Sequence, residues 1–155
     1  MKKIGLMLAV ALSSPLAQAD GFVCNTVEQD LTVKIYNHTQ PARGTRTGAV
    51  MVLSDPSIGD GNRTIARFQG VNGLLESSNL SYEAKVDLRF ADSRRQGELI
   101  LGTKLGQLAT IRADLDFSFS APALDGESLS GMLTLTKRNG SEIVRDLECV
   151  RYLKN

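Results

Sequence analysis

The chain has 155 residues, a formal net charge of +1 and no Trp, and only 5% of its residues are aromatic. A charge balance this close to neutral argues against broad electrostatic binding to nucleic acid or to an anionic membrane. The scarcity of aromatic residues also leaves little material for stacking against sugars or bases. The length fits one domain with a substantial core.

The N-terminal segment has the three-part pattern of a secretory signal peptide. Two lysines form a positive start, the run from Ile4 to Leu12 is apolar or small, and Ala17-Gln18-Ala19 supplies small residues at a cleavage site. The apolar run is too short to span a bilayer, which takes about 20 residues. A membrane anchor or a buried helix is therefore the weaker interpretation. We predict a signal peptide over residues 1–19, cleaved after Ala19, and a single β-domain over residues 20–155.

A short signal with a Lys-Lys start is typical of bacteria, so the predicted location is periplasmic or extracellular. A lipid anchor would need small residues directly before an early cysteine, and the bulky Phe22 and Val23 precede Cys24. In an oxidising compartment two cysteines are expected to pair, which predicts a disulfide between Cys24 and Cys149. Without the two lysines of the signal, 16 basic and 17 acidic residues leave a net charge of −1.

Alternation of apolar and polar residues, which is typical of β-strands, recurs along the chain. It predicts strands, in chain order, over residues 31–36, 49–53, 64–68, 80–90, 98–103, 109–119, 129–136 and 143–153. The clearest case is Leu80–Phe90, where six apolar and five polar residues alternate without interruption. A helix would scatter those apolar residues around its circumference.

Turn-forming residues separate the predicted strands. The breaks fall at residues 37–48, 55–62, 72–73, 92–97, 105–106, 121–126 and 139–140. A single helical turn is conceivable over residues 73–78, and no longer helix is predicted. Short connections between successive strands favour an antiparallel meander.

Asn139-Gly140 is the strongest hairpin signal, because both central residues of a tight type I′ turn need positive φ. A two-residue loop there would place Leu133 opposite Asp146. A three-residue loop that extends through Ser141 would place Leu133 opposite Leu147. We expect the second register, since it pairs apolar residues with each other.

The predicted fold class is all-β, with eight or nine antiparallel strands. Long strands in a meander either close into an up-and-down β-barrel or form a two-sheet sandwich. A bond between Cys24 and Cys149 favours closure, because it brings the first and last strands together. The architecture is similar in outline to lipocalin-like folds, although their Gly-x-Trp motif is absent and the likeness is of architecture alone. A small outer-membrane barrel is a weaker alternative, because the chain lacks the aromatic girdles of such barrels.

Few residues suggest catalysis or metal binding. The single histidine, His38, lies in a predicted loop without an orienting partner. The stretch 55–62 has oxygen ligands for Ca²⁺, but its spacing is not that of an EF-hand loop and its residues are common in turns. Asp114 and Asp116 share one face of a strand, as paired carboxylates of a glycosidase would, but they also suit a solvated face. We therefore predict no catalytic residue, no metal site and no cofactor.

Arg145 and Arg151 interrupt the apolar face of the last predicted strand. Inside a barrel, an arginine could hold an anionic head group. The predicted function is therefore an exported, non-enzymatic protein that binds an apolar or amphiphilic small ligand. The alternative is a structural or interaction component of the bacterial envelope that uses the loops at 37–48 and 55–62. A hydrolase is the weakest hypothesis. Nucleic acid and an integral membrane span are not expected.

Overall fold

A computed structural model describes residues 19–44, 46–57, 63–89, 91, 97–117 and 125–154. The proposed signal peptide lies outside these residues except for its last position. The structure has these strands: β1 (Ala19–Thr26), β2 (Thr32–Asn37), β3 (Arg46–Asp55), β4 (Arg63–Glu76), β5 (Asn79–Lys85), β6 (Leu99–Ile100), β7 (Thr103–Lys104), β8 (Leu108–Asp116), β9 (Ser128–Lys137) and β10 (Glu142–Lys154). A 3₁₀ helix, η1, spans Leu105–Gln107.

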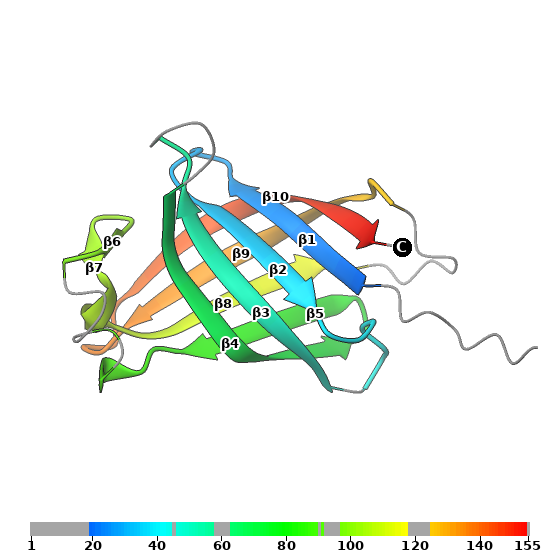
Figure 1. Cartoon of the computed structure of the whole chain (residues 1–155), viewed down its shortest axis with the longest axis horizontal. Coiled ribbons are helices and arrows are strands. Elements are labelled where there is room, and N and C mark those ends of the chain that lie inside the picture. The colour runs from blue at the N-terminus through cyan, green and yellow to red at the C-terminus, as the bar shows by residue number, and fades with distance from the viewer. Residues whose placement is uncertain are drawn as a thin grey trace, which may run out of the picture.

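Eight of these strands form one closed antiparallel barrel in the order β1-β10-β9-β8-β5-β4-β3-β2 (Figure 1). The all-β prediction is confirmed, and of the two predicted architectures the structure has the barrel. Closure removes the exposed strand edges that an open sheet would leave for aggregation. The first strand, β1, pairs with β10 on one side and with β2 on the other.

The core follows from the alternation of residues along each strand. In β8, Ile111, Ala113 and Leu115 are fully buried, and the polar residues between them face outward. Two other large side chains pack around Phe22: its ring centroid lies 6.2 Å from that of Tyr82 and 6.0 Å from that of Phe117. An eight-stranded barrel is just wide enough for side chains to fill its interior.

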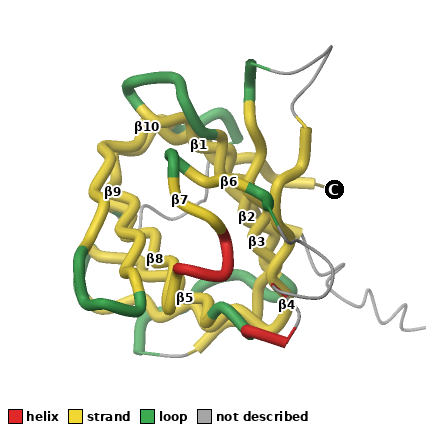
Figure 2. The backbone as a smooth tube through the Cα atoms, turned by 90° about the vertical axis from the view of Figure 1, so that its left-hand side faces the viewer, coloured by secondary structure: helices red, strands yellow, loops and turns green. Residues whose placement is uncertain are grey.

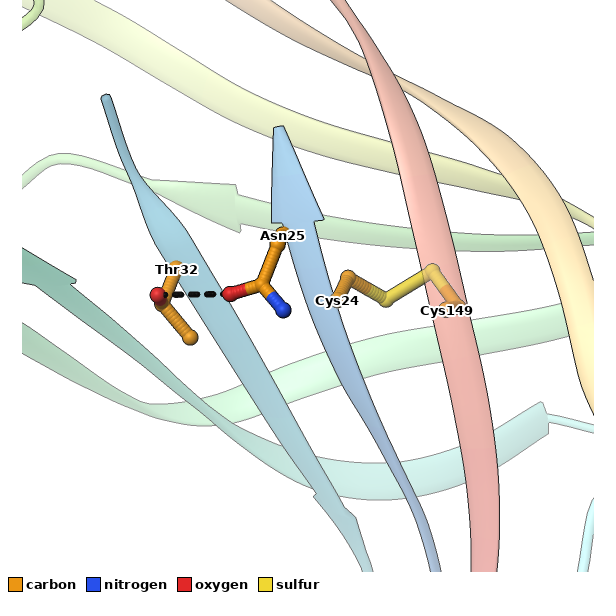
Figure 3. The surroundings of a disulfide bond; sticks show 4 residues. All are labelled: Cys24, Asn25, Thr32 and Cys149. Carbon is orange, nitrogen blue, oxygen red and sulfur yellow. Dashed lines mark hydrogen bonds between the residues drawn. A yellow bond between two sulfur atoms is a disulfide. The ribbon is translucent and has the colours of Figure 1, made fainter. Parts of the chain in front are cut away.

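The disulfide between Cys24 and Cys149 joins β1 to β10 (Figure 3). The two residues are direct partners in the antiparallel register, and their Cα atoms lie 3.9 Å apart. On the other side of β1, the hydroxyl of Thr32 in β2 donates a hydrogen bond of 2.9 Å to Asn25. The predicted disulfide is confirmed, and it closes the barrel between the first and last strands.

The strand predicted over 80–90 is too long at its C-terminal end. β5 stops at Lys85, and residues 88, 89 and 91 are helical. The carboxylate of Asp87 accepts a hydrogen bond of 2.9 Å from the backbone N–H of Arg89, and its carbonyl accepts one from Ala91. A helix N-cap of this kind overrides the alternating pattern that follows it.

The break predicted at Asn72-Gly73 is also wrong, as is the helical turn over 73–78. Both residues lie inside β4, and the turn comes later, where Ser77 has a φ of 53°. Gly73 is needed for close packing: a Cβ there would lie 2.6 Å from Cγ2 of Thr47 and 2.7 Å from Cε1 of Tyr82. Glycine marks a close approach as often as a turn, and the sequence does not tell the two apart.

The β9–β10 hairpin has the predicted loop length but a different register. Lys137 donates a backbone hydrogen bond to Ser141, so the three loop residues are 138–140, not 139–141. Leu133 consequently pairs with Arg145 rather than with Leu147. Gly140, with a φ of 88°, takes the left-handed last position of the loop, as a three-residue hairpin requires. The shift is of two residues, so the inward and outward faces are unchanged.

The connection between β5 and β8 lies across one mouth of the barrel (Figure 2). The strand predicted over 98–103 is there a small hairpin, β6–β7, whose turn residues Leu101 and Gly102 have φ values of 50° and 75°. Ile100 and Leu105 from this connection are buried in the core. The connection therefore closes this mouth with apolar side chains.

Replacement of both cysteines, as Cys24→Ala/Cys149→Ala, tests the role of the disulfide. The bond spans 125 positions of sequence. We expect the free energy of unfolding to fall by about 4–5 kcal/mol, the value that loop-closure entropy gives for a loop of this size. Urea unfolding followed by circular dichroism measures it, with reduced wild-type protein as the control. An unchanged urea midpoint would show that strand pairing alone holds the ends together.

Candidate functional site

The barrel wall opens on one side because β4 and β5 pair over only part of their lengths. Their register runs from Asn72↔Glu83 to Glu76↔Asn79. Before Val71, the described residues of β4 pair with β3 alone. Beyond Glu83, β5 continues along β8, and no pairing to β4 is seen among the described residues. Two neighbouring strands thus diverge toward the mouth that the β5–β8 connection covers.

A β-bulge accounts for the course of β4 at this point. The β3–β4 register passes from Ala49↔Val71 to Met51↔Phe68, so β4 has one residue more than β3 in this interval. Gly70, with a φ of 66°, takes a backbone conformation that other residues adopt only with strain. Bulges bend the strand that carries them and increase its twist. The bulge therefore directs the N-terminal half of β4 away from β5.

A cavity of about 440 Å³ lies where the two strands separate. We call it the lateral pocket. Its apolar lining comes from β4, the end of β5 and the β5–β8 connection: Ala66, Phe68, Val86, Ala91 and Leu105. All except Phe68 are buried, and Phe68 packs against the core. The pocket is an apolar recess in the side of the barrel.

Arg138, in the β9–β10 loop, forms hydrogen bonds with backbone groups beside the pocket. Its Nε donates a hydrogen bond of 2.9 Å to the carbonyl of Gly106, and Nη2 donates one of 3.1 Å to the carbonyl of Val86. Its backbone N–H donates to Gln107. One side chain thus ties η1 to the end of β5, and the pocket wall is held in place without a ligand.

Two cations lie at the outer rim of the pocket. Arg67 in β4 and Lys85 in β5 both contribute to the lining and are exposed. Asp87 is the acidic residue of the lining, and its carboxylate lies 3.5 Å from the guanidinium of Arg89. An apolar recess with cations at its opening suits a molecule that has an apolar part and a polar end.

Arg151, one of the two arginines that the sequence singled out, lies inside the barrel. Its side chain is only 2% exposed and forms two hydrogen bonds with the carboxylate of Asp20, of 2.7 and 3.1 Å. Glu127 lies 3.5 Å from the same guanidinium, and the ring of Phe117 packs against it with its centroid 4.8 Å away. The chain itself therefore supplies the anions that Arg151 binds.

Further polar groups lie inside the barrel. The hydroxyl of Tyr82 donates a hydrogen bond of 2.7 Å to Oδ1 of Asn37. Burial raises the pKa of Tyr82, so this hydroxyl stays protonated and remains a donor. The Nδ2 group of Asn37 is buried and has no hydrogen-bond partner among the residues that the structure describes.

Arg145 lies near the start of β10, whereas Arg151 lies near its end, so the structure does not bring the two together. Nε of Arg145 is 3.2 Å from Oδ2 of Asp30 and 3.9 Å from Oε2 of Glu28, both in the β1–β2 turn. Each arginine thus has carboxylate partners within the chain. Their role as head-group ligands stays a prediction.

The paired carboxylates lie on the outer face of β8. Asp114 accepts hydrogen bonds from Arg112 and from the hydroxyl of Ser81, and Asp116 accepts one from Ser130. Burial opposes ionisation of Asp114, but the hydrogen bonds from Arg112 and Ser81 outweigh it and hold the pKa of that carboxyl below its ordinary value. An ionised, fully bonded carboxylate is a poor general acid.

The other sequence candidates form no site among the described residues. His38 is exposed, and its backbone N–H donates to Gly48. Most of the proposed calcium loop, residues 58–62, lies outside the described part of the chain. In the part that is described, no group of three or more His, Cys, Asp or Glu side chains could hold a metal ion. No helix there is long and apolar enough to cross a bilayer.

Comparison with protein-family models, with curated proteins and with solved structures found no match to this chain. The class of protein is therefore defined by the fold: a closed eight-stranded antiparallel β-barrel with a disulfide between its first and last strands.

The periodicity of the sequence does not indicate the lateral pocket. In the sequence, Arg67 and Lys85 are ordinary solvent-facing residues of alternating strands. They lie at a pocket only because β4 and β5 do not pair beside them. One signal was present: Gly70 directly follows the predicted strand over 64–68, and an isolated glycine near a strand can indicate a bulge.

The buried ion pair gives a second testable consequence. Loss of Arg151 leaves the buried carboxylate of Asp20 without its counter-ion, so we expect Arg151→Ala to lower the free energy of unfolding by about 3–5 kcal/mol. Asp20→Ala should cost less, because Glu127, 3.5 Å away, still compensates the guanidinium. The double variant should lose clearly less than the sum of the two, because the residues interact directly. Strictly additive losses in urea unfolding would contradict this.

Asp30→Ala provides the matched control. It removes the nearer carboxylate partner of Arg145, and the side chain of Asp30 is 37% exposed. Exposed pairs contribute only about 0.2–1 kcal/mol, so a small loss is expected.

Proposed function

We propose that this chain is an exported, non-enzymatic binding protein that holds a small apolar or amphiphilic molecule in its lateral pocket. The observation that carries the proposal is the apolar recess of about 440 Å³ where β4 and β5 separate. Small-molecule sites commonly have volumes of about 300–1,000 Å³, apolar linings and a few polar groups. The volume and lining of this recess fall within that description.

The packing of the barrel interior supports a site in the wall. Phe22, Tyr82 and Phe117 are fully buried and occupy the interior near the end where β1 begins. The β5–β8 connection lies across the other mouth (Figure 2), and its residues Ile100 and Leu105 are buried in the core. A ligand in the lateral pocket would need to displace neither group of side chains.

Export is proposed on the basis of the signal pattern, and the disulfide is compatible with it. Structural disulfides persist in oxidising compartments and are rare in the cytosol. The location proposed is the periplasm or the cell exterior.

An interaction role is the second candidate, and one surface feature favours it. On the outer face, Tyr36 and Tyr152 lie edge to face with their ring centroids 6.2 Å apart, and Tyr36 is 44% exposed. Val150, on the same side of β10 as Tyr152, is 47% exposed. Exposed tyrosines and aliphatic residues are common in protein interfaces.

A bulky residue at the rim should block the pocket without disturbing the core. Gln69 lines the pocket and is exposed, so we expect Gln69→Trp to weaken binding of the neutral fluorescent probe N-phenyl-1-naphthylamine by about ten-fold or more, since a loss of about 1.4 kcal/mol corresponds to that factor. Probe fluorescence during titration measures the Kd.

Val144→Trp is the matched control, because Val144 is an exposed residue of a barrel strand outside the pocket lining. Its Kd should equal that of the wild type. If the wild-type protein gives no saturable fluorescence, or if both variants bind equally well, the lateral pocket is not the site.

Export can be tested directly. Full-length protein produced in a bacterial host should be recovered from the periplasm or the medium with a mass that corresponds to residues 20–155 and an intact disulfide. Mass spectrometry of the intact protein measures both. Recovery of the uncleaved chain from the cytosol alone would disprove the export proposal and leave the binding proposal untouched.

A further inference from the structure

We propose that the ligand of the lateral pocket carries an anionic head group, and that Arg67 and Lys85 bind this group from the two sides of the gap. This inference rests on the proposed function. It specifies the chemical class of the ligand, a single-chain amphiphile with a carboxylate or phosphate at one end.

The register places these two cations on opposite strands at the same opening. Arg67 pairs with Val52 of β3 and faces outward, whereas its neighbours Ala66 and Phe68 pair with inward-facing residues of β3. On the other strand, Lys85 pairs with Thr110 of β8 and faces outward, and the next residue is buried. The rim of the gap is therefore cationic on both sides, and its floor is apolar.

Neither cation is committed to a carboxylate of the chain. Among the described residues, the structure gives Arg67 and Lys85 no ion pair and no side-chain hydrogen bond. Arg112, Arg145 and Arg151, by contrast, are each bonded to an aspartate. Two cations without partners beside an apolar recess are free to bind an external anion.

Asp87, the acidic residue of the pocket, has described contacts with Arg89. The carboxylate of Asp87 accepts the backbone N–H of Arg89 and lies beside the guanidinium of the same residue. Arg67 and Lys85 can also extend their aliphatic stems along the apolar lining while their charged ends stay in water. An alkyl chain would contact Phe68, Val86 and Leu105, and its anionic end would stay at the surface between the two cations.

Competition between amphiphiles of equal chain length tests whether the pocket prefers an anionic head group. The neutral probe N-phenyl-1-naphthylamine is displaced from the full chain by dodecanoate, dodecyl phosphate, 1-dodecanol or dodecyltrimethylammonium, each below its micellar concentration. We expect the two anions to displace it at concentrations about ten-fold lower than the alcohol and the cation, as a charge-assisted contact allows. Comparison of the two anions shows which head group is preferred.

Arg67→Gln/Lys85→Gln should abolish the preference for anions. The displacing concentrations of the two anions are compared with that of 1-dodecanol in the same variant, so a change in the Kd of the neutral probe itself does not affect the result. The matched control, Arg43→Gln/Arg46→Gln, removes the same charge at the far end of β3, where Arg46 pairs with Leu74. It should keep the preference. If the control variant keeps the anion preference, a general effect of net charge is also excluded.

The outcomes separate this inference from the proposed function. If the wild-type protein binds the neutral probe but all four amphiphiles displace it equally, or if the Arg67→Gln/Lys85→Gln variant keeps the anion preference, the head-group assignment is overturned and the binding function stands. If the wild-type protein does not bind the neutral probe, the proposed function itself fails.

Discussion

The structure depends on closure of the barrel between β1 and β10. These strands pair continuously from Ala19↔Lys154 to Thr26↔Leu147, and three kinds of contact reinforce the seam in succession. The buried ion pair of Asp20 and Arg151 lies near one end, the disulfide follows, and the pair of Asp30 and Arg145 lies at the other. Because the partners come from opposite ends of the chain, closure carries a large entropic cost that local contacts cannot offset, and a covalent bond lowers it by restricting the unfolded chain.

The weakest part of the wall lies opposite that seam. In the barrel order, β1, β2, β3 and β4 lead from the seam in one direction and β10, β9, β8 and β5 in the other, so the β4–β5 gap is as far from the seam as the ring allows. A barrel held firmly on one side tolerates incomplete pairing on the other. The bulge at Gly70 and the N-cap at Asp87 separate the two strands, and Arg138 keeps the opening in a fixed shape. Function concentrates on such irregular positions of a rigid scaffold.

The sequence predicts those features that arise from local periodicity. The alternation in β8 is uninterrupted from Thr110 to Asp116, and the burial of Ile111 and Leu115 follows it. Predictions failed where a residue had two possible roles. Gly73 is a residue type common in turns, but here it is needed for close packing. Asp87 occupies a polar position of the alternating pattern, but it caps a helical turn. The inward position of Arg151 follows from the alternation of inward and outward residues along β10. Its partner, Asp20, is distant in sequence and becomes apparent only when β1 and β10 pair. The lateral pocket could not be predicted, because it depends on the absence of pairing between two strands.

The position of the pocket also explains how a small barrel can have both a tight core and an apolar recess. Eight strands enclose just enough space for side chains, so a ligand along the axis would compete with Phe22, Tyr82 and Phe117 for the same volume. Such a replacement would remove aromatic contacts and expose the ion pair beneath Phe117, which is costly in a region of low dielectric. A recess in the wall avoids that conflict, because a ligand there does not displace the buried aromatic side chains of the interior. In the function that we propose, an amphiphile would bury its apolar part there, while the cations at the rim, and solvent beyond them, would accommodate its charged end.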